Sequence, residues 1–380
     1  MSHRVFYVPI VAVVALALGP GSITFAQAPP SQPPAPIGTI RETPTSVQGQ
    51  QPARPRVVIL ATGGTIAGAG TAGGYGYTSG QFNVEDLIKA VPGLDGLADL
   101  TGEQVANIGS QDMNDGVWLK LANRVNEVLA DPEVAGVVIT HGTDTMEETA
   151  YFLNLVVKSD KPVVLVGSMR PATAISADGP ANLYNGVAAA ADPRARGRGV
   201  LVVVNDEIHN ARNVTKTNTT NLETFNSPER GLAGLVASGK LTWFERMDKR
   251  HTTSSQFSVK GRTQLPRVDI LYAHANMDAS LIDAAIQNGA KGIVIAGVGD
   301  GNMTKEALGK LQAASGKGVV VVRSTRLPSG MVMRNAEVDD DKMGFVASGE
   351  LNPSKSRVLT QLALLSTHDP QQVQKLFTQY

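Results

Sequence analysis

Cysteine is absent from this chain of 380 residues, and histidine occurs only six times. The lack of cysteine excludes a disulfide, a thiolate nucleophile and a cysteine-bound metal site. No two histidines have the H-x-x-x-H spacing of a zinc pair, so the sequence predicts no zinc site. We therefore expect neither a bound metal nor a cofactor.

An excess of one charge sign is also missing, because lysine plus arginine and aspartate plus glutamate both number 34. A formal net charge of zero argues against the broad electrostatic surface that binds nucleic acid or an anionic membrane. Apolar residues make up 42% of the chain, which is ample for a packed core. The length predicts one large or two medium domains.

The apolar run at the N-terminus is too short for a membrane-spanning helix. It extends from Val5 to Leu18 after Arg4, whereas a span needs ~20 residues. Small residues around Ala26 offer a cleavage site, so we interpret residues 1–26 as a signal peptide. The mature protein is then expected in the periplasm without membrane attachment. An uncleaved anchor and a cytoplasmic enzyme with an adventitious apolar start are the alternatives.

The chain after the signal peptide divides into a linker and two alternating series of strands and helices. Residues 27–55 are rich in proline and glutamine and lack apolar periodicity, which predicts a disordered linker. The alternation predicts an α/β fold, in which mostly parallel sheets are covered by helices on both faces. We expect a larger N-terminal domain at 56–244, a polar connection at 245–266 and a smaller C-terminal domain at 267–380.

Apolar periodicity places the individual elements. In the first series we expect strands that begin near 57 and lie at 137–140, 162–167 and 199–205, and helices near 118–129, 146–157 and 181–191. In the second series we expect strands near 268–274, 292–297 and 318–324, and helices near 278–287, 305–314, 355–365 and 370–377.

Two of the expected strands end in hydroxyl residues. The first runs into two glycines and Thr65, and the second runs into Thr143 and Asp144. Glycines let the chain turn sharply and bring backbone N–H groups near a ligand, and open α/β sheets bind ligands at strand carboxyl ends. These residues indicate a hydrolytic site with a hydroxyl nucleophile. A threonine that merely ends a strand turn is the alternative.

The glycine-rich segment from Gly68 to Gly80 carries Tyr75 and Tyr77. We interpret it as a lid that closes over substrate, with a plain surface loop as the alternative. Its beginning also matches the G-x-G-x-x-G pattern of dinucleotide sites. This match is poorly placed, because the first glycine lies well beyond the strand that it should follow directly.

Ser110 and Gln111 are polar, uncharged and next to a glycine. They suit hydrogen bonding to the carboxylate and amine of a small zwitterion. The competing interpretation is that Ser110 or Asp112 caps the following helix.

Lys216 lies in a polar segment and is the best candidate partner for Asp144 and Thr143. A lysine held near an aspartate and partly desolvated can transfer protons to a threonine. A solvated surface charge is the ordinary role of a single lysine. We expect structural roles for His141 and His274.

Taken together, these segments resemble the bacterial type II L-asparaginases over nearly all of the chain from Arg56 to Tyr380. The matching segments are Ala61–Gly68, Gly109–Asp115, Thr140–Ala150, Val166–Pro171, Ser176–Pro180, Val214–Thr220 and Asn335–Asp340. The resemblance implies hydrolysis of L-asparagine to L-aspartate and ammonia through an acyl-enzyme, with minor L-glutaminase activity.

The resemblance also implies a role for each matching residue. Thr65 is the expected nucleophile, activated by Tyr77 and Glu337. Thr143, Lys216 and Asp144 are expected to form a second catalytic cluster. The residues expected to hold the substrate are Ser110, Gln111, Asp144 and Asn302. The family further implies a homotetramer of two intimate dimers, in which Glu337 and Asn302 reach a neighbouring subunit's site.

A few single residues indicate the substrate preference and mark two differences from the family. Relatives with strong glutaminase activity tend to carry serine where this chain has Asn302, and a Ser-Glu pair in place of Ser110 and Gln111, so the chain resembles the asparagine-preferring branch. Ser159 occupies the position of one cysteine of a disulfide found in some relatives. The lid has two tyrosines, and Tyr77 is chosen over Tyr75 because a Thr-x-Gly sequence follows it.

A periplasmic amino-acid-binding protein is the rival interpretation from another functional class. Such a protein also has two α/β domains, a signal peptide and polar loops at strand ends. Binding alone uses Ser110, Gln111 and Asp144 but needs neither Thr65 nor Lys216. Ammonia release from L-asparagine distinguishes the two.

Overall fold

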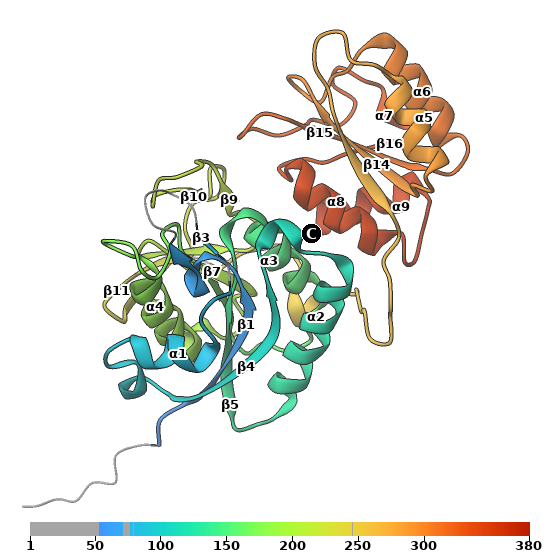
Figure 1. Cartoon of the computed structure of the whole chain (residues 1–380). Coiled ribbons are helices and arrows are strands. Elements are labelled where there is room, and N and C mark those ends of the chain that lie inside the picture. The colour runs from blue at the N-terminus through green and yellow to red at the C-terminus, as the bar shows by residue number, and fades with distance from the viewer. Residues whose placement is uncertain (1–52, 71–76, 79, 245) are drawn as a thin grey trace, which may run out of the picture. The chain divides into compact units, whose positions relative to one another are not determined.

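The computed structural model describes residues 53–70, 77, 78, 80–244 and 246–380 (Figure 1). The predicted signal peptide, nearly all of the predicted linker and Tyr75 lie outside the described residues. At Tyr77 only the backbone is described.

The larger sheet has eight strands in the order β12-β11-β8-β7-β6-β5-β1-β4. Their bounds are β1 (Arg56–Gly63), β4 (Asp99–Ile108), β5 (Val134–Thr140), β6 (Val163–Val166), β7 (Val200–Val204), β8 (Glu207–Asn210), β11 (Gly234–Ala237) and β12 (Lys240–Trp243). Five adjacent strands pair in parallel, namely β7, β6, β5, β1 and β4. The remaining strands, β8, β11 and β12, pair antiparallel.

The antiparallel strands β8, β11 and β12 extend the predicted parallel sheet at one edge. The turns that precede β8 and β12 explain why these strands reverse direction. Asn205 and Asp206 join β7 to β8 with φ values of 52° and 62°, and Ser238 and Gly239 join β11 to β12 with 49° and 77°. Two-residue turns with positive φ at both positions are the connections that suit antiparallel hairpins.

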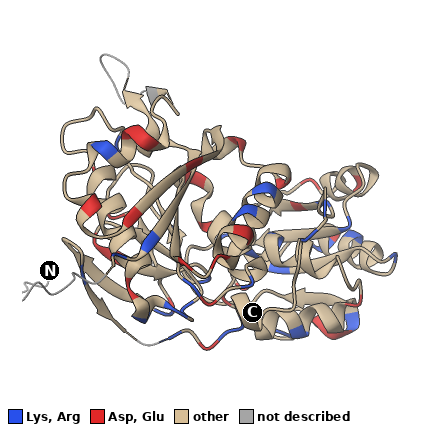
Figure 2. Cartoon of the chain, turned by 90° about the horizontal axis from the view of Figure 1, so that it is seen from below, with Lys and Arg blue, Asp and Glu red and all other residues tan. Residues whose placement is uncertain are grey.

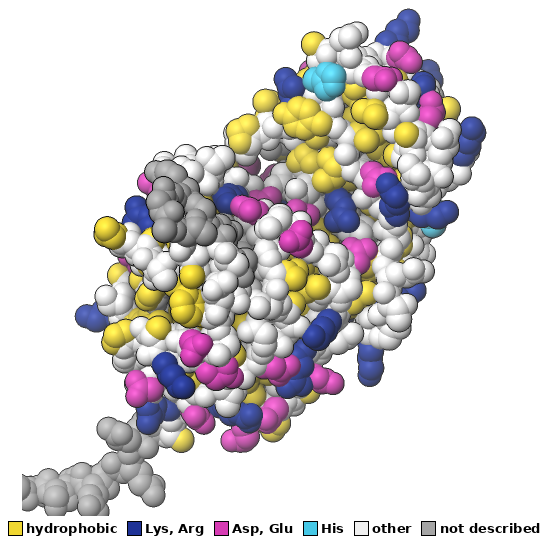
Figure 3. All heavy atoms as spheres, viewed as in Figure 1, with side chains coloured by type: hydrophobic (Ala, Val, Ile, Leu, Met, Phe, Trp, Pro, Cys, Tyr) yellow, Lys and Arg dark blue, Asp and Glu magenta, His cyan; other side chains and the backbone are white. Residues whose placement is uncertain are grey.

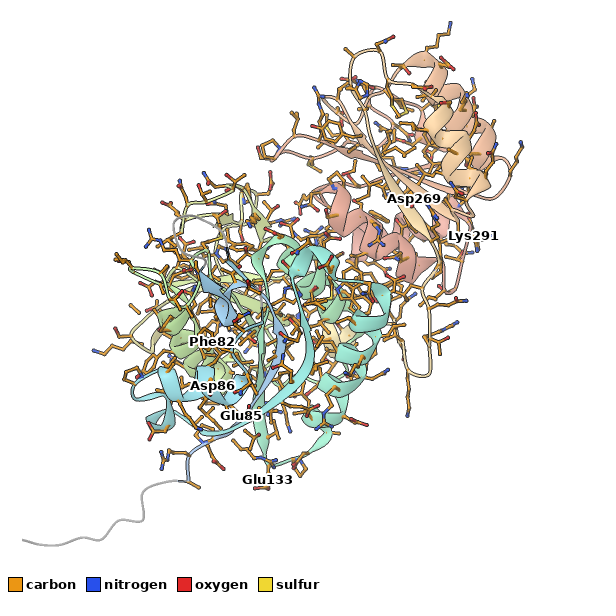
Figure 4. All side chains as sticks on the ribbon, viewed as in Figure 1. Phe82, Glu85, Asp86, Glu133, Asp269 and Lys291 are labelled. Carbon is orange, nitrogen blue, oxygen red and sulfur yellow. The ribbon has the colours of Figure 1, made fainter. Side chains whose placement is uncertain are left out.

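Helices cover both faces of the larger sheet. Helices α2 (Asp115–Ala130) and α3 (Met146–Val156) share one buried cluster with alternate residues of β1 and β5. Helices α1 (Val84–Ala90) and α4 (Gly179–Ala191) share a second cluster with the intervening residues. This division follows from the alternation of side chains along a strand. Three of the residues labelled in Figure 4, Phe82, Glu85 and Asp86, mark the start of α1.

The smaller sheet consists of four parallel strands in the order β13-β14-β15-β16. The strands are β13 (Val268–Tyr272), β14 (Gly292–Gly297), β15 (Val320–Thr325) and β16 (Phe345–Ala347), and the helices are α5 (Ser280–Gln287), α6 (Lys305–Ser315), α7 (Asp340–Met343), α8 (Pro353–Ala363) and α9 (Pro370–Gln379). Asp269 and Lys291, labelled in Figure 4, lie near the beginnings of β13 and β14. The predicted class of two α/β domains with mostly parallel sheets is confirmed.

One buried apolar cluster belongs to both sheets. It includes Trp118 and Leu153 from α2 and α3 together with Val358 and Leu359 from α8. Burial of apolar surface is the main force that stabilises such contacts. The segment between the two sheets, in its described part 246–266, has no strand and one short 3-10 helix, Thr252–Ser254.

Acidic and basic side chains are interspersed along the elements in the view of Figure 2, as the balanced composition suggests. Within the described part of the chain, no helix has the length and hydropathy to cross a membrane.

Candidate active site

Three loops meet at one edge of the larger sheet, because the carboxyl ends of β4, β1 and β5 are adjacent. The Gly64 N–H donates to the Ile108 carbonyl at 3.0 Å. A Cβ placed on Gly64 would lie 2.3 Å from the nitrogen of Gly142, and one on Gly142 would lie 2.6 Å from the Ser110 hydroxyl oxygen. Glycine at both positions therefore lets the loops after three strands approach one another.

Thr65 begins a short 3-10 helix (Thr65–Ala67) directly after the Gly63–Gly64 turn, where φ is 103° and 85°. Residues other than glycine rarely adopt these angles. Thr65 is only 5% exposed. The sharp turn thus places Thr65 at the strand end, as the sequence predicts, and the structure shows that the residue is nearly buried there.

Thr143, Asp144 and Lys216 form a hydrogen-bonded group. The Lys216 Nζ lies 2.9 Å from the Thr143 hydroxyl and 2.6 Å from Asp144 Oδ1. Lys216 ends the two-residue strand β9 (Thr215–Lys216), which pairs with β10 (Phe225–Asn226). The side chain of Lys216 is 17% exposed and that of Asp144 is 56% exposed, so solvent screens the ion pair. The pair therefore contributes little to stability.

A polar cavity of about 390 Å³ opens beside this group and is bordered by two of its members, Asp144 and Lys216. The other lining residues are Glu147, Thr217, Asn218 and Thr219. Such a hollow suits a small polar ligand.

Ser110 is buried and linked to the Thr143–Asp144 loop. Its hydroxyl oxygen accepts from the Asp144 N–H at 3.2 Å, and its carbonyl accepts from the Thr145 hydroxyl at 2.7 Å. Helix α2 is capped instead by Asn114, whose side chain accepts from the Val117 N–H at 3.2 Å. The alternative in which Ser110 or Asp112 caps this helix is therefore wrong.

Gln111 is exposed at the same edge of the sheet. Its side-chain amide lies 3.5 Å from a carboxylate oxygen of Asp112. The amide is therefore accessible to a ligand from solvent.

Asn302 and Glu337 form a second group in the C-terminal domain, where the Asn302 side-chain amide donates to the Glu337 carboxylate. Asn302 is fixed by a backbone bridge to Val298, with hydrogen bonds of 2.7 and 2.8 Å, while Glu337 is exposed. Among the described residues, no hydrogen bond or ion pair joins these two residues to Thr65 or Lys216.

A fully buried ion pair contacts the two loops that carry Asn302 and Glu337. Arg323 donates to both carboxylate oxygens of Asp340 at 2.6 and 2.8 Å, and both side chains are 0% exposed. Arg323 also donates to the carbonyls of Asp300 at 2.8 Å and Met333 at 3.1 Å. One guanidinium therefore holds both loops. Sequence reasoning missed Arg323, which carries no motif, although Asp340 ends a matching segment.

The predicted lid is described only at its two ends. Strand β2 (Ala69–Gly70) pairs with β3 (Tyr77–Thr78), and Gly70 faces Tyr77 in this ladder. The Gly70 N–H donates to the Thr173 hydroxyl at 2.8 Å. The lid base is thus anchored, while the side chains of both tyrosines lie outside the described part.

His141 is fully buried, and its Nδ1 hydrogen bonds to the Gly142 carbonyl at 2.6 Å. Burial lowers its pKa to about 4, against the opposite effect of that hydrogen bond, so the ring is neutral near pH 7. His274 is exposed and hydrogen bonds to the Ala275 carbonyl at 2.7 Å. Across the residues described, no three His, Cys, Asp or Glu side chains are placed to hold a metal ion.

Fold and site define a two-domain α/β protein whose strand-end hydroxyls lie beside a lysine–aspartate pair. Residues 56–249 match the family model described as the N-terminal asparaginase domain, and residues 267–377 match the glutaminase/asparaginase C-terminal domain. These matches cover most of the described chain. The chain belongs to the asparaginase family.

Individual relatives agree with this assignment. L-asparaginase 2 of Escherichia coli is 54% identical over 329 residues, which cover 86% of this chain and 94% of that protein. The probable periplasmic L-asparaginase of Haemophilus influenzae is 52% identical over 86% of this chain and 93% of its own length. The crystal structure of a probable cytoplasmic L-asparaginase from Campylobacter jejuni superposes with a TM-score of 0.81 at 47% identity, covering 86% of this chain and all of that chain.

Proposed function

We propose that this protein is an amidohydrolase that converts L-asparagine to L-aspartate and ammonia. The observation that carries this proposal is the Lys216 ammonium held between Thr143 and Asp144, at a sheet edge that also presents Thr65. Family membership and the L-asparaginases among its relatives support it.

In the first half of the proposed reaction, the Thr65 oxygen attacks the side-chain amide carbon of the substrate. The hydroxyl proton leaves as the new C–O bond forms, and Tyr77 and Glu337 assist this step. The C–N bond then breaks, and ammonia departs with an added proton. Water hydrolyses the acyl-enzyme and restores Thr65.

The second catalytic group supplies proton transfer and binding. Lys216 and Asp144 relay protons through the Thr143 hydroxyl, while Ser110, Gln111 and Asp144 hold the α-carboxylate and α-amine. Backbone N–H groups near the two threonines stabilise the oxyanion, and loss of one such donor typically costs about 2.7–4 kcal/mol of barrier.

We further propose that Asn302 and Glu337 complete the site of a neighbouring copy within a homotetramer. Among the described residues, no hydrogen bond or ion pair joins them to Thr65 of the same chain, which supports this arrangement. Exposed apolar side chains of the C-terminal domain, some of them visible in Figure 3, give the same indication. Tyr272, Met331 and Met333 are 59, 55 and 53% exposed, and association of copies would bury such side chains.

The expected substrate preference is L-asparagine over L-glutamine by more than ~1.4 kcal/mol, which is tenfold in kcat/KM. The reason is the combination of Asn302 with Ser110 and Gln111, which resembles the asparagine-preferring branch. Ammonia release measured with each amide tests this prediction and the proposed function together. Comparable kcat/KM values would refute the preference, and no ammonia from either amide would refute the function.

Export to the periplasm with removal of residues 1–26 is proposed on the N-terminal sequence alone. Relatives described as periplasmic and as cytoplasmic both exist, so the family does not decide the question. We expect N-terminal sequencing of the protein from a periplasmic fraction to begin at Gln27. A chain beginning at Met1 and retained in the cytoplasm would contradict export.

A further inference from the structure

The three consecutive residues that end at Lys216 are held by three side chains from outside their own strand. Lys355 Nζ donates to the Val214 carbonyl. The Asn352 amide donates to the Thr215 hydroxyl at 3.2 Å. A carboxylate oxygen of Glu147 accepts from the Lys216 N–H at 2.8 Å. The backbone of Lys216 is therefore fixed by groups other than the two side chains that its ammonium group contacts.

Glu147 is the centre of this arrangement. It belongs to the first turn of α3, which begins directly after Thr143 and Asp144. Its second carboxylate oxygen accepts from the Asn352 amide at 2.7 Å, and the residue is only 8% exposed. A buried carboxylate with both oxygens hydrogen-bonded has a fixed direction, because any rotation would break a bond made in a poorly solvated place.

The other two side chains belong to the start of α8 in the C-terminal domain. Asn352 caps this helix by accepting from the Lys355 N–H at 3.0 Å. Lys355 is 2% exposed. Burial lowers the pKa of Lys355, and the Glu147 carboxylate acts in the opposite direction. The carboxylate thus also compensates a buried positive charge.

We infer that Glu147 is a positioning residue that sets where the Lys216 ammonium lies relative to Thr143 and Asp144, and that Asn352 and Lys355 connect α8 to this setting. The inference rests on the proposed function. Reaction rate depends steeply on such placement, since a displacement of 1 Å in a catalytic group can cost ~10²-fold. Glu147 does not belong to the groups proposed to hold the substrate.

Glu147→Gln tests this inference, with Glu148→Gln as the matched control. The Glu147 carboxylate accepts from two donors, the Lys216 N–H and the Asn352 amide. Glutamine has one oxygen that accepts and one NH₂ group that donates, so one of the two hydrogen bonds is lost. Glu148 is the next residue of the same helix, and its nearest cation is Arg357 at 4.0 Å. We expect Glu147→Gln to lower kcat for L-asparagine by about 10- to 100-fold, with KM within about twofold of the wild-type value. Glu148→Gln should leave both nearly unchanged.

An unimpaired Glu147→Gln variant, or an equal loss of kcat in both variants, would overturn the inference. Wild-type protein is assayed in the same series, so absence of ammonia from every sample would refute the proposed function instead. Should Glu147→Gln fail to fold, Thr215→Val decides, because it keeps the shape of the side chain and removes only the Asn352 contact. A lower kcat in that variant supports the inference, and an unchanged kcat overturns it.

Discussion

Thr65→Ala is expected to lower kcat by roughly 10³-fold or more, as removal of a nucleophile does in other hydrolases. The hydroxyl is the group that forms the new bond to the substrate carbon, so no other side chain replaces it. Ser110, Gln111 and Asp144 remain, and L-asparagine should still bind the variant. Calorimetry measures the binding, and ammonia release measures the turnover.

Thr65→Ser is the matched control, because it keeps the hydroxyl and deletes only a methyl group. It should retain turnover that Thr65→Ala lacks. Acid-quenched enzyme digested for mass spectrometry should carry the substrate acyl group at Thr65. Full activity in Thr65→Ala, or an adduct mapped to Thr143, would move the nucleophile to Thr143.

Arg323→Met is expected to lower the free energy of unfolding by about 3–5 kcal/mol, because it leaves a buried carboxylate without its cation. Asp340 receives two hydrogen bonds from Arg323 at 2.6 and 2.8 Å, and water reaches neither side chain. The loops with Asn302 and Glu337 also lose their common anchor, so activity should fall in protein that is still folded. Urea unfolding at constant protein concentration measures the stability.

Arg334→Met provides the control for this stability change. Arg334 pairs with Asp341, the residue after Asp340, and the two side chains are 29 and 54% exposed. Exposed ion pairs contribute little, so the midpoint of urea unfolding should stay close to the wild-type value. Equal effects of the two substitutions would show that burial of the Arg323–Asp340 pair does not matter.

Most strands of the parallel core could be predicted from sequence because their pattern is local. The exception is β4, which forms no apolar run because Val105 is its one buried residue. Apolar runs such as Val163–Val166 and Gly292–Gly297 have few polar interruptions, and buried parallel strands have this property. The strands β8, β11, β12 and β16 have only three or four residues each. None of them has four consecutive buried residues as Val163–Val166 does, and turns and neighbouring strands set their pairing, so periodicity does not reveal them.

The candidate site also has a part that local sequence indicates and a part that depends on contacts between distant residues. Thr65, Thr143 and Ser110 stand directly after strands, and the adjacency of β4, β1 and β5 brings their loops together. The bond from Lys216 to Asp144 joins residues 72 positions apart. Sequence analysis named Lys216 as the best candidate partner for Asp144 from the chemistry of the two side chains, because no local pattern connects them. Glu147 is an acid in the first turn of a helix, which is an ordinary position for a carboxylate. Its contact with Asn352 spans 205 positions, which no local pattern encodes.

The buried cluster shared by α2, α3 and α8 has a consequence for synthesis. A nascent chain that has emerged only as far as residue 266 lacks α8 and so exposes part of the buried cluster that α3 shares with this helix. Such an intermediate tends to aggregate and to bind chaperones until the C-terminal domain has been synthesised. Truncation between the two family-model segments should consequently yield insoluble fragments rather than a working half.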